Sequence, residues 1–188
     1  MVGTRGPASF EALFSMFPVP AFSPAILEAM LEYIERVRRN HALEHATVSL
    51  LLSRLGPELR LVGRASGNGF FIYGDVPGEV LADCASEGLA RMQKGEAHWA
   101  VTPLCGTNIA TGAVLASLST MAVLGNGQRR DRLGNAIVAS MVALIAAQPI
   151  GRWIQKNLTT SPDLATTSIV SIESRADGRF HKVRTRQD

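Results

Sequence analysis

Two histidines and a glutamate lie close together in the segment His41-Ala-Leu-Glu44-His45. On a helix, residues four positions apart share a face, so the imidazoles of His41 and His45 can converge on one metal ion. The order H-x-x-E-H inverts the common zinc-protease motif and matches the pattern of the inverzincin peptidases. In that chemistry the histidines bind zinc and the glutamate accepts a proton from the metal-activated water. The segment therefore predicts zinc ligands at His41 and His45, with Glu44 as the catalytic group.

A catalytic zinc site needs a third protein ligand. The first candidate is Cys105, which lies in a glycine-containing turn, Pro103-Leu-Cys-Gly-Thr-Asn108, directly before an apolar segment. The second candidate is Glu87. Each has a plainer interpretation, Cys105 as a small packed side chain and Glu87 as a solvated surface acid. His98 and His181 are expected on strands as ordinary surface residues, and Thr107 and Asn108 are expected to cap the apolar helix.

The histidine motif also has a purely structural interpretation. Two imidazoles and a carboxylate on a buried stripe need partners, because an unpaired buried polar group is costly. A hydrogen-bonded cluster that fixes helix packing would satisfy His41, Glu44 and His45 without any metal. A pattern with three fixed positions also arises by chance, so both interpretations stay open at the level of sequence.

The element that must position the motif is a helix over residues 24–55. Ser23-Pro24 is typical of a helix start, and Gly56-Pro57 is typical of a helix end. At 100° per residue the apolar and motif residues form one stripe, with Glu44 on its edge and arginines opposite. A break at Arg39-Asn40 would divide the segment into two helices. The stripe consists of Met30, Ile34, Val37, His41, His45, Val48, Leu52 and Leu55.

Short strands and a second helix follow. Residues 60–64 and 70–73 predict strands around a turn at residues 66–69, and residues 98–102 predict a third strand. Between them, a helix is expected from Asp75-Val-Pro77 to Gly95. Near the end of the chain, residues 167–174 and 179–186 alternate around Asp177-Gly178, which predicts a β-hairpin that rejoins the same sheet.

Two apolar runs, residues 109–124 and 133–150, contain no charged residue. Each is near the lower end of the roughly 17–25 residues that a membrane-spanning helix needs. Small residues recur every fourth position in both runs, and this spacing lets two helices approach closely in lipid. The sequence therefore predicts a transmembrane helical hairpin over residues 105–152. The alternative is a helical hairpin buried in a soluble core.

Composition bounds the remaining possibilities. The chain has 188 residues, 46% of them hydrophobic and only 19% charged, which is typical of one domain that contains an apolar segment. The net charge of +3 comes from scattered arginines, and aromatics make up 6%, so no basic and aromatic surface for nucleic acid is expected. Two cysteines form no disulfide framework.

These elements predict an α+β fold in which a small mixed domain is interrupted by the transmembrane hairpin. Residues 24–104 and 153–188 form the domain, and residues 1–23 are an apolar, proline-broken segment that lies at the membrane interface. Arginines in the hairpin loop and basic residues beside the domain favour opposite orientations. Since no signal-peptide pattern precedes the domain, we expect it on the cytoplasmic side of the inner membrane, with lipid as a partner.

Three motifs together resemble an uncharacterised bacterial membrane family, catalogued as a domain of unknown function, with examples in cyanobacteria and other phototrophs. They are Arg39-Asn-His-Ala-Leu-Glu-His-Ala-Thr47, Tyr73-Gly-Asp-Val-Pro77 and Cys105-Gly-Thr-Asn108. The likeness runs from about residue 36 to the C-terminal hairpin and includes Asn157-Leu-Thr-Thr160. It implies a two-helix membrane protein and supplies no activity. Family members often carry a histidine shortly before the Cys-Gly-Thr-Asn motif, where this chain has Thr102 or Pro103.

Three functional hypotheses follow from the sequence. The first is a membrane-bound zinc-dependent hydrolase or peptidase that uses His41, Glu44, His45 and Cys105. The second is a non-enzymatic membrane subunit or assembly factor of a larger, photosynthetic complex, in which the histidines are structural or bind a cofactor. The third hypothesis is a basic protein that binds lipid surfaces, and only the arginines and the N-terminal phenylalanines support it.

Overall fold

The computed structural model describes residues 23–125, 129–175 and 177–188 of the chain, which divides into two compact units, residues 1–32 and 33–188. The N-terminal segment that is predicted to be interfacial lies outside the described residues, except for Ser23. In the first unit, the described part is the beginning of a helix whose large apolar side chains are exposed. They are Ile26, Leu27, Met30 and Leu31.

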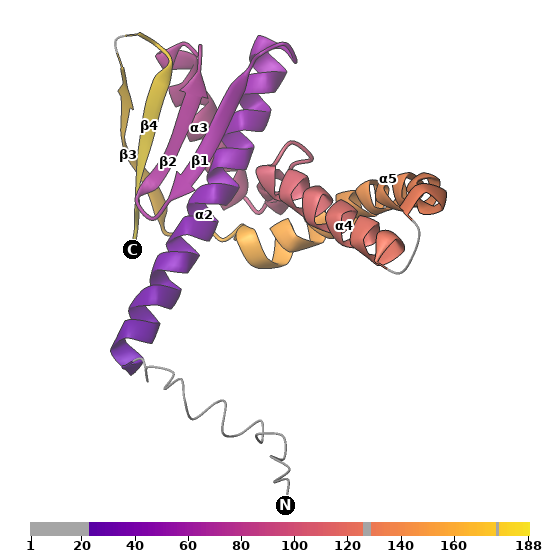
Figure 1. Cartoon of the computed structure of the whole chain (residues 1–188). Helices are drawn as coiled ribbons and strands as arrows, with labels where there is room; N and C mark the ends of the chain where they lie inside the picture. The colour runs from indigo at the N-terminus through magenta and orange to yellow at the C-terminus, as the bar shows by residue number, and fades with distance from the viewer. Residues whose placement is uncertain (1–22, 126–128, 176) are drawn as a thin grey trace, which may run out of the picture. The chain divides into compact units, whose positions relative to one another are not determined.

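The described elements are two pairs of strands separated by a run of helices and preceded by a long helix, in agreement with the predicted α+β class (Figure 1). In chain order they are α2 (Pro24–Leu55), β1 (Leu61–Ser66), β2 (Gly69–Gly74), α3 (Gly78–Gln93), a 3-10 helix (Ala97–Ala100), α4 (Gly106–Leu124), α5 (Arg129–Ile154), a π-helical turn (Gln155–Thr159), β3 (Thr167–Ser174) and β4 (Phe180–Gln187).

The four strands form one antiparallel sheet in the order β1-β2-β4-β3. Strand β4 therefore pairs with β2, although α3, α4 and α5 lie between them in the sequence. Phe70 of β2, for example, lies opposite Val183 of β4. The predicted rejoining of the sheet is confirmed, and the hairpin α4–α5 is an insertion into the α/β fold.

Helices α2 and α3 pack against one face of the sheet, and the core lies between these layers (Figure 1). Small residues bring the two helices together, since a Cβ at Gly88 of α3 would lie only 3.1 Å from the Cβ of Ala46 in α2. Most of the fully buried apolar side chains come from α2, β2, α3 and β4. They include Leu43, Leu51, Phe70, Ile72, Leu81, Cys84 and Val183.

The predicted buried stripe of α2 is not the face that packs in the core. The core face carries Ala42, Leu43, Ala46, Leu50 and Leu51. The stripe is shifted around the helix, and its members Val37, His41, Val48 and Leu52 are only half-buried and line a pocket instead. The helix has two apolar faces, and the periodicity alone does not say which one the sheet covers.

The alternative of a break at Arg39-Asn40 does not apply, because α2 is continuous over Pro24–Leu55. Asn40 is buried, and its amide donates to the Ser66 carbonyl at 2.8 Å. One further expectation is wrong. Residues 98–102 form no strand; residues 97–100 form the 3-10 helix instead. The sheet ends at β1 on one side and β3 on the other, so residues 98–102 have no strand neighbour.

The two hairpin helices contact each other through small residues, as predicted. A Cβ at Gly112 of α4 would lie 3.2 Å from Leu144 and 3.8 Å from Ala147 of α5. The hydroxyl oxygens of Thr120 and Ser140 lie 2.7 Å apart across the same interface. The second helix is longer than expected, since residues 150–159 continue it through the π-helical turn, beyond the predicted boundary at residue 152.

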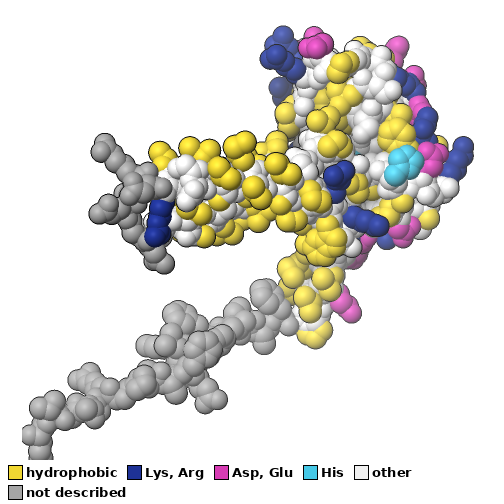
Figure 2. All heavy atoms as spheres, turned by 90° about the vertical axis from the view of Figure 1, so that its right-hand side faces the viewer, with side chains coloured by type: hydrophobic (Ala, Val, Ile, Leu, Met, Phe, Trp, Pro, Cys, Tyr) yellow, Lys and Arg dark blue, Asp and Glu magenta, His cyan; other side chains and the backbone are white. Residues whose placement is uncertain are grey.

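The outer surface of the hairpin is apolar (Figure 2). Two segments, Gly106–Leu124 and Arg132–Thr159, are long and apolar enough to cross a membrane, and only 11% of either span is buried. The hairpin is therefore not buried in the core of the described structure. In contrast, charged side chains gather on the α/β part of the visible face (Figure 2). The most exposed hairpin residues are Ile109, Met121, Ile145 and Trp153.

Candidate metal centre

Three of the predicted site residues meet beside the start of α4. His41 and His45 project from neighbouring turns of α2, and Cys105 comes from the residue before α4. One ligand atom from each of these side chains lies within 4.8 Å of the other two. His45 and Cys105 are buried, whereas His41 is half-buried. The arrangement is a candidate metal centre with two nitrogen donors and one sulfur donor.

Both imidazoles are held in the same tautomer by backbone carbonyls. Nδ1 of His41 donates to the carbonyl of Thr159 at 2.9 Å, and Nδ1 of His45 donates to the carbonyl of Ala100 at 2.7 Å. A carbonyl only accepts, so the proton of each neutral ring is on Nδ1 and the lone pair is on Nε2. A hydrogen bond from the far nitrogen is what orients a metal-binding histidine.

The Nε2 atoms are directed toward the cluster. Nε2 of His41 lies 3.6 Å from the Cys105 sulfur. Nε2 of His45 is fully buried and has no hydrogen-bond partner among the described residues. A buried polar nitrogen without a partner is unusual and costly, and a bound cation would satisfy it.

The two carbonyls are available because each lies at the end of a helical turn. Ala100 ends the 3-10 helix, and Thr159 ends the π-helical turn that follows α5. Carbonyls in the last turn of a helix have no partner within that helix. The irregular ends of these two segments thus supply the acceptors for His41 and His45.

Glu44 lies beside the metal-binding face but inside the protein. Its carboxylate occupies the space that a side chain at Gly63 of β1 would fill. Burial raises the pKa of Glu44 from 4.5 to about 7, although the nearby His41 and the Ala65 backbone act in the opposite direction. A glutamate that titrates near neutral pH is suited to accept and return a proton.

Cys105 has the properties of a thiolate ligand. Burial by itself would raise the pKa of its thiol, but the imidazole of His45 and the hydroxyl and amide of Thr107 outweigh burial, so the pKa is lowered. Cys105 is also the N-cap of α4, because the Thr107 N–H donates to its sulfur at 3.4 Å. The capping role that the sequence assigned to Thr107 and Asn108 thus belongs to Cys105.

Asn108 and Gln155 form a buried amide pair that was not predicted. The Gln155 side chain donates to Asn108 at 2.9 Å and accepts the Thr102 N–H at 3.0 Å. Asn108 fits against Gly151, where a Cβ would overlap its side chain. The pair joins the two hairpin helices to the segment that precedes Cys105. The sequence signal for this pair is the position of the two amides, since Asn108 directly precedes the first apolar run and Gln155 follows the second.

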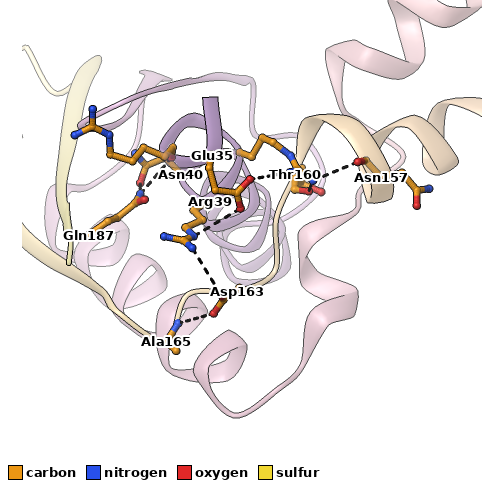
Figure 3. A network of polar contacts seen from close by, with 10 residues as sticks. Glu35, Arg39, Asn40, Asn157, Thr160, Asp163, Ala165 and Gln187 are labelled. Carbon is orange, nitrogen blue, oxygen red and sulfur yellow. Dashed lines mark hydrogen bonds and ion pairs between the residues drawn. The ribbon is translucent and has the colours of Figure 1, made fainter. Parts of the chain in front are cut away.

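A second set of contacts joins α2 to the chain that follows the hairpin (Figure 3). Arg38 donates to the carbonyls of Asn157 and Thr160 at 3.2 and 3.1 Å. Arg39 lies 3.7 Å from Glu35 and 3.6 Å from Asp163. These contacts flank Thr159, so they hold its carbonyl near His41.

The candidate metal centre opens into a pocket of about 760 Å³. One wall is the predicted stripe of α2, the opposite wall is β1, and the turn before α4 completes the lining. The walls are mostly apolar, and Glu44, His41, His45 and Cys105 all line the pocket. The apolar lining includes Val37, Val48, Leu52, Leu61, Val62 and Ile109.

The other predicted candidates lie outside the cluster. Glu87 forms ion pairs with Arg54 and Arg91, which lower the pKa of its carboxyl, so it is not a ligand. His98 is exposed on the 3-10 helix and not on a strand. His181 is on a strand but is fully buried, which corrects the expectation of a surface residue. Its ring contacts the Ser174 hydroxyl at 2.7 Å and the Gly178 carbonyl at 2.9 Å.

Comparison with known proteins gives the family and no activity. An uncharacterized protein of Picosynechococcus sp. (strain ATCC 27264 / PCC 7002 / PR-6) is 29% identical over 177 residues, which cover 88% of this chain and 84% of the relative. No solved structure matches the chain. The family model described as Domain of unknown function (DUF6391) matches residues 36–172, which include the candidate metal centre and both hairpin helices. The chain therefore belongs to the DUF6391 family.

Proposed function

We propose that this protein is a membrane-anchored metal-dependent hydrolase, with zinc held by His41, His45 and Cys105 and with Glu44 as the general base. The observation that carries the proposal is the convergence of His41, His45 and Cys105, whose ligand atoms all lie within 4.8 Å of one another. Nδ1 of each imidazole is already bonded to a backbone carbonyl, so the lone pair on Nε2 is available to a metal ion.

The donor set favours zinc over other common metals. Imidazole nitrogen and thiolate sulfur are the ligands of tetrahedral zinc, whereas magnesium and calcium prefer oxygen. With bond lengths of about 2.1 and 2.3 Å, tetrahedral ligands lie roughly 3.4–3.7 Å apart. The three donor atoms lie within 4.8 Å of one another, so small side-chain rotations bring them to that spacing. Three protein ligands leave one position open, as catalytic zinc sites do.

When bound, zinc would polarise a substrate carbonyl and lower the pKa of a water molecule. Glu44 lines the same pocket and can accept the proton of the attacking water. As the scissile bond breaks, the proton passes from Glu44 to the leaving amine or alkoxide, and the hydroxyl of the water remains on the acyl group. With a pKa of about 7, Glu44 can take and return this proton at neutral pH.

The anchor in this proposal is the hairpin α4–α5. Its length, its hydropathy and the exposure of its apolar side chains support insertion into a bilayer. The α/β domain would then lie at the membrane surface, on the cytoplasmic side of the inner membrane in our proposal. Because Cys105 directly precedes α4, the metal centre would lie next to the lipid headgroups.

Metal analysis of the purified full-length protein tests the zinc site. We expect about one zinc per chain, and we expect the His41→Ala, His45→Ala double variant to lose it. The matched control is His98→Ala, which removes an exposed histidine and should retain the metal. Absence of bound metal at neutral pH in the unaltered protein would reject the proposal.

Substitution Glu44→Gln tests whether the bound metal is catalytic or structural. General-base catalysis contributes about 10²–10⁴ to a rate, so hydrolysis by Glu44→Gln should fall by a factor in that range while zinc content is unchanged. If zinc binds and Glu44→Gln leaves turnover unchanged, the metal is structural. The chain would then be a non-enzymatic membrane protein, for which the exposed hairpin offers contact surface to a larger complex.

A further inference from the structure

We infer that the substrate is an extended polypeptide segment, which binds by adding a strand to the free edge of β1. This inference rests on the proposed hydrolase and names its substrate class. Three observations carry it: the backbone groups of β1 that have no partner among the described residues, the Glu44 carboxylate that lies against Gly63 of the same strand, and the pocket between β1 and α2.

Strand β1 is an edge strand with regular hydrogen bonding on one side only. Ser66 and Gly69 close a two-residue turn, so they form a hydrogen-bonded pair, and such pairs alternate along an antiparallel ladder. The backbone groups of Val62, Arg64 and Ser66 therefore face β2. Those of Leu61, Gly63 and Ala65 face away from the sheet. Leu61 and Gly63 thus offer backbone donors and acceptors to an added strand.

The two edges of the sheet differ in how well they could accept a strand. Strand β1 keeps an uninterrupted register over its six residues. Strand β3, at the other edge, is irregular between Ile169 and Ser171. Bulges of this kind disrupt pairing and protect edge strands from addition. The unprotected edge is the one that borders the candidate metal centre.

The chemistry and the edge are close together because of Gly63. A Cβ at this position would overlap the Glu44 carboxylate, so glycine allows the general base to lie directly beside β1. A peptide paired with Leu61 and Gly63 would place its backbone next to Glu44. All five residues from Leu61 to Ala65 line the same pocket as His41, His45 and Cys105.

The pocket also accommodates the side chains of an extended peptide. Alternate residues of an added strand point to opposite sides, so every second side chain would enter the space between β1 and α2. That space is lined by apolar residues of both elements, among them Val48, Leu52 and Leu61. A lipid acyl chain could use the apolar lining but would leave the backbone groups of Leu61 and Gly63 unpaired. The free edge therefore favours a peptide.

Photo-crosslinking locates the bound polypeptide. The probe is fluorescein-labelled β-casein, an unfolded protein, added to zinc-loaded full-length Glu44→Gln protein in detergent micelles. The photoreactive residue p-benzoylphenylalanine replaces either Val62 of β1 or Val170 of β3, which are 65% and 58% exposed. We expect a strong crosslink from position 62 and background labelling from position 170. Equal labelling at both positions, or none at position 62, would overturn the inference.

A pair of substitutions tests whether the backbone of β1 makes the contact. Leu61→Pro removes one outward N–H at the first residue of the strand, where proline is tolerated, and Leu61→Ala removes the side chain but keeps the N–H. Casein binding should be about fivefold weaker in Leu61→Pro than in Leu61→Ala, the factor for one net hydrogen bond. Equal affinities would contradict strand addition. Zinc content and circular dichroism show whether both variants are folded. If Leu61→Pro is not folded, the crosslinking experiment decides whether casein binds at β1.

Turnover of two probes distinguishes this inference from the proposed function. The probes are labelled casein and vesicles of dioleoylphosphatidylcholine. Cleavage of casein that Glu44→Gln abolishes supports both proposals. Hydrolysis of the lipid ester without cleavage of casein overturns the peptide substrate and keeps the hydrolase. If zinc binds and neither probe is cleaved, while casein crosslinks at position 62, the hydrolase fails and β1 is a peptide-binding edge.

Discussion

The middle of α2 and the hairpin α4–α5 both depart from the usual placement of polar side chains outside and apolar side chains inside. Helix α2 buries polar side chains, and the hairpin exposes apolar ones. Helix α2 buries polar groups, including Asn40, Glu44 and His45, inside the α/β domain. The hairpin exposes large apolar groups, including Ile109 and Ile145, which are 74% and 72% exposed. In a soluble protein, the informative deviations are buried polar groups and large exposed apolar patches, and this chain has both.

The difference shows what each region lacks. Asn40 has partners within the chain, because Ser66, Thr185 and Gln187 all bond to its side chain. His45 does not, since its Nε2 has no partner among the described residues. A bound metal would provide a partner for the buried Nε2 of His45, and a bilayer would cover the exposed apolar side chains of the hairpin. The following predictions test these two requirements separately, from the largest expected effect to the smallest.

The largest effect is expected in the hairpin. Ile145 lies near the middle of the span Arg132–Thr159, and Ile145→Lys should oppose membrane insertion by about 3 kcal/mol. The fraction of chain that becomes inserted into microsomes during cell-free synthesis measures this cost. The control is Val170→Lys, which alters a comparably exposed residue of the sheet and should leave insertion unchanged. Equal behaviour of the two variants would mean that the hairpin surface does not face lipid.

The second prediction concerns the pH dependence of the metal-free protein. Between about pH 4.5 and 7, the unfolded chain releases the Glu44 proton while the folded chain keeps it. The free energy of unfolding should therefore fall as the pH rises through this window, by up to about 3 kcal/mol. Thermal unfolding in excess chelator at pH 5 and at pH 8 measures the difference. The same dependence in Glu44→Gln would show that another group is responsible.

Metal loading sharpens that prediction because it should change the sign of the pH dependence. Histidine and cysteine bind zinc only after they lose their protons, so the zinc-loaded protein should be less stable at pH 5 than at pH 8. A metal-loaded protein that still loses stability as the pH rises would indicate that the metal binds elsewhere.

The third prediction concerns Gly63. An added Cβ would overlap the Glu44 carboxylate, so Gly63→Ala should destabilise the protein by about 1–3 kcal/mol and lower hydrolytic activity. The matched control is Gly106→Ala, where an added Cβ meets nothing within 4 Å. Thermal unfolding and zinc content of both variants distinguish a displaced Glu44 from a lost metal. Unaltered stability in Gly63→Ala would contradict the close packing of Glu44 against β1.

The smallest effect is expected inside the hairpin interface. Thr120→Val removes the hydroxyl that contacts Ser140, and hydrogen bonds between membrane helices contribute about 0.6 kcal/mol. A slightly lower thermal unfolding temperature in detergent should report this loss. Ser119→Ala is the control, since that hydroxyl bonds to Ala116 of its own helix. An effect of several kcal/mol would mean that the polar pair has a role beyond packing.

Much of the architecture was predictable because it depends on local patterns. Helix boundaries near Pro24 and Leu55, the β1–β2 turn and the C-terminal hairpin follow from caps, turns and alternation. The approach of Cys105 to His41 and His45 was also expected, since all three had an assigned metal role. The family of unknown function was identified from motifs that lie within the matched residues.

Other features were not predictable, because they depend on contacts between distant residues. The choice between the two apolar faces of α2 depends on where the sheet packs. The buried position of His181 depends on Ser174 across the β3–β4 hairpin. The carbonyls of Ala100 and Thr159 carry no sequence signal, because every residue has a backbone carbonyl. Only the folded chain shows which two of them meet the imidazoles.

The hydrogen bond from His41 to the Thr159 carbonyl joins residues 118 positions apart in the chain. During synthesis, the ribosome must therefore translate both apolar helices before this imidazole obtains its orienting partner. A chain that stops in the hairpin would leave His41 without its orienting carbonyl, whereas the partner of His45, Ala100, precedes the hairpin. In the proposed function, the metal centre would therefore be completed only after both hairpin helices have been synthesised.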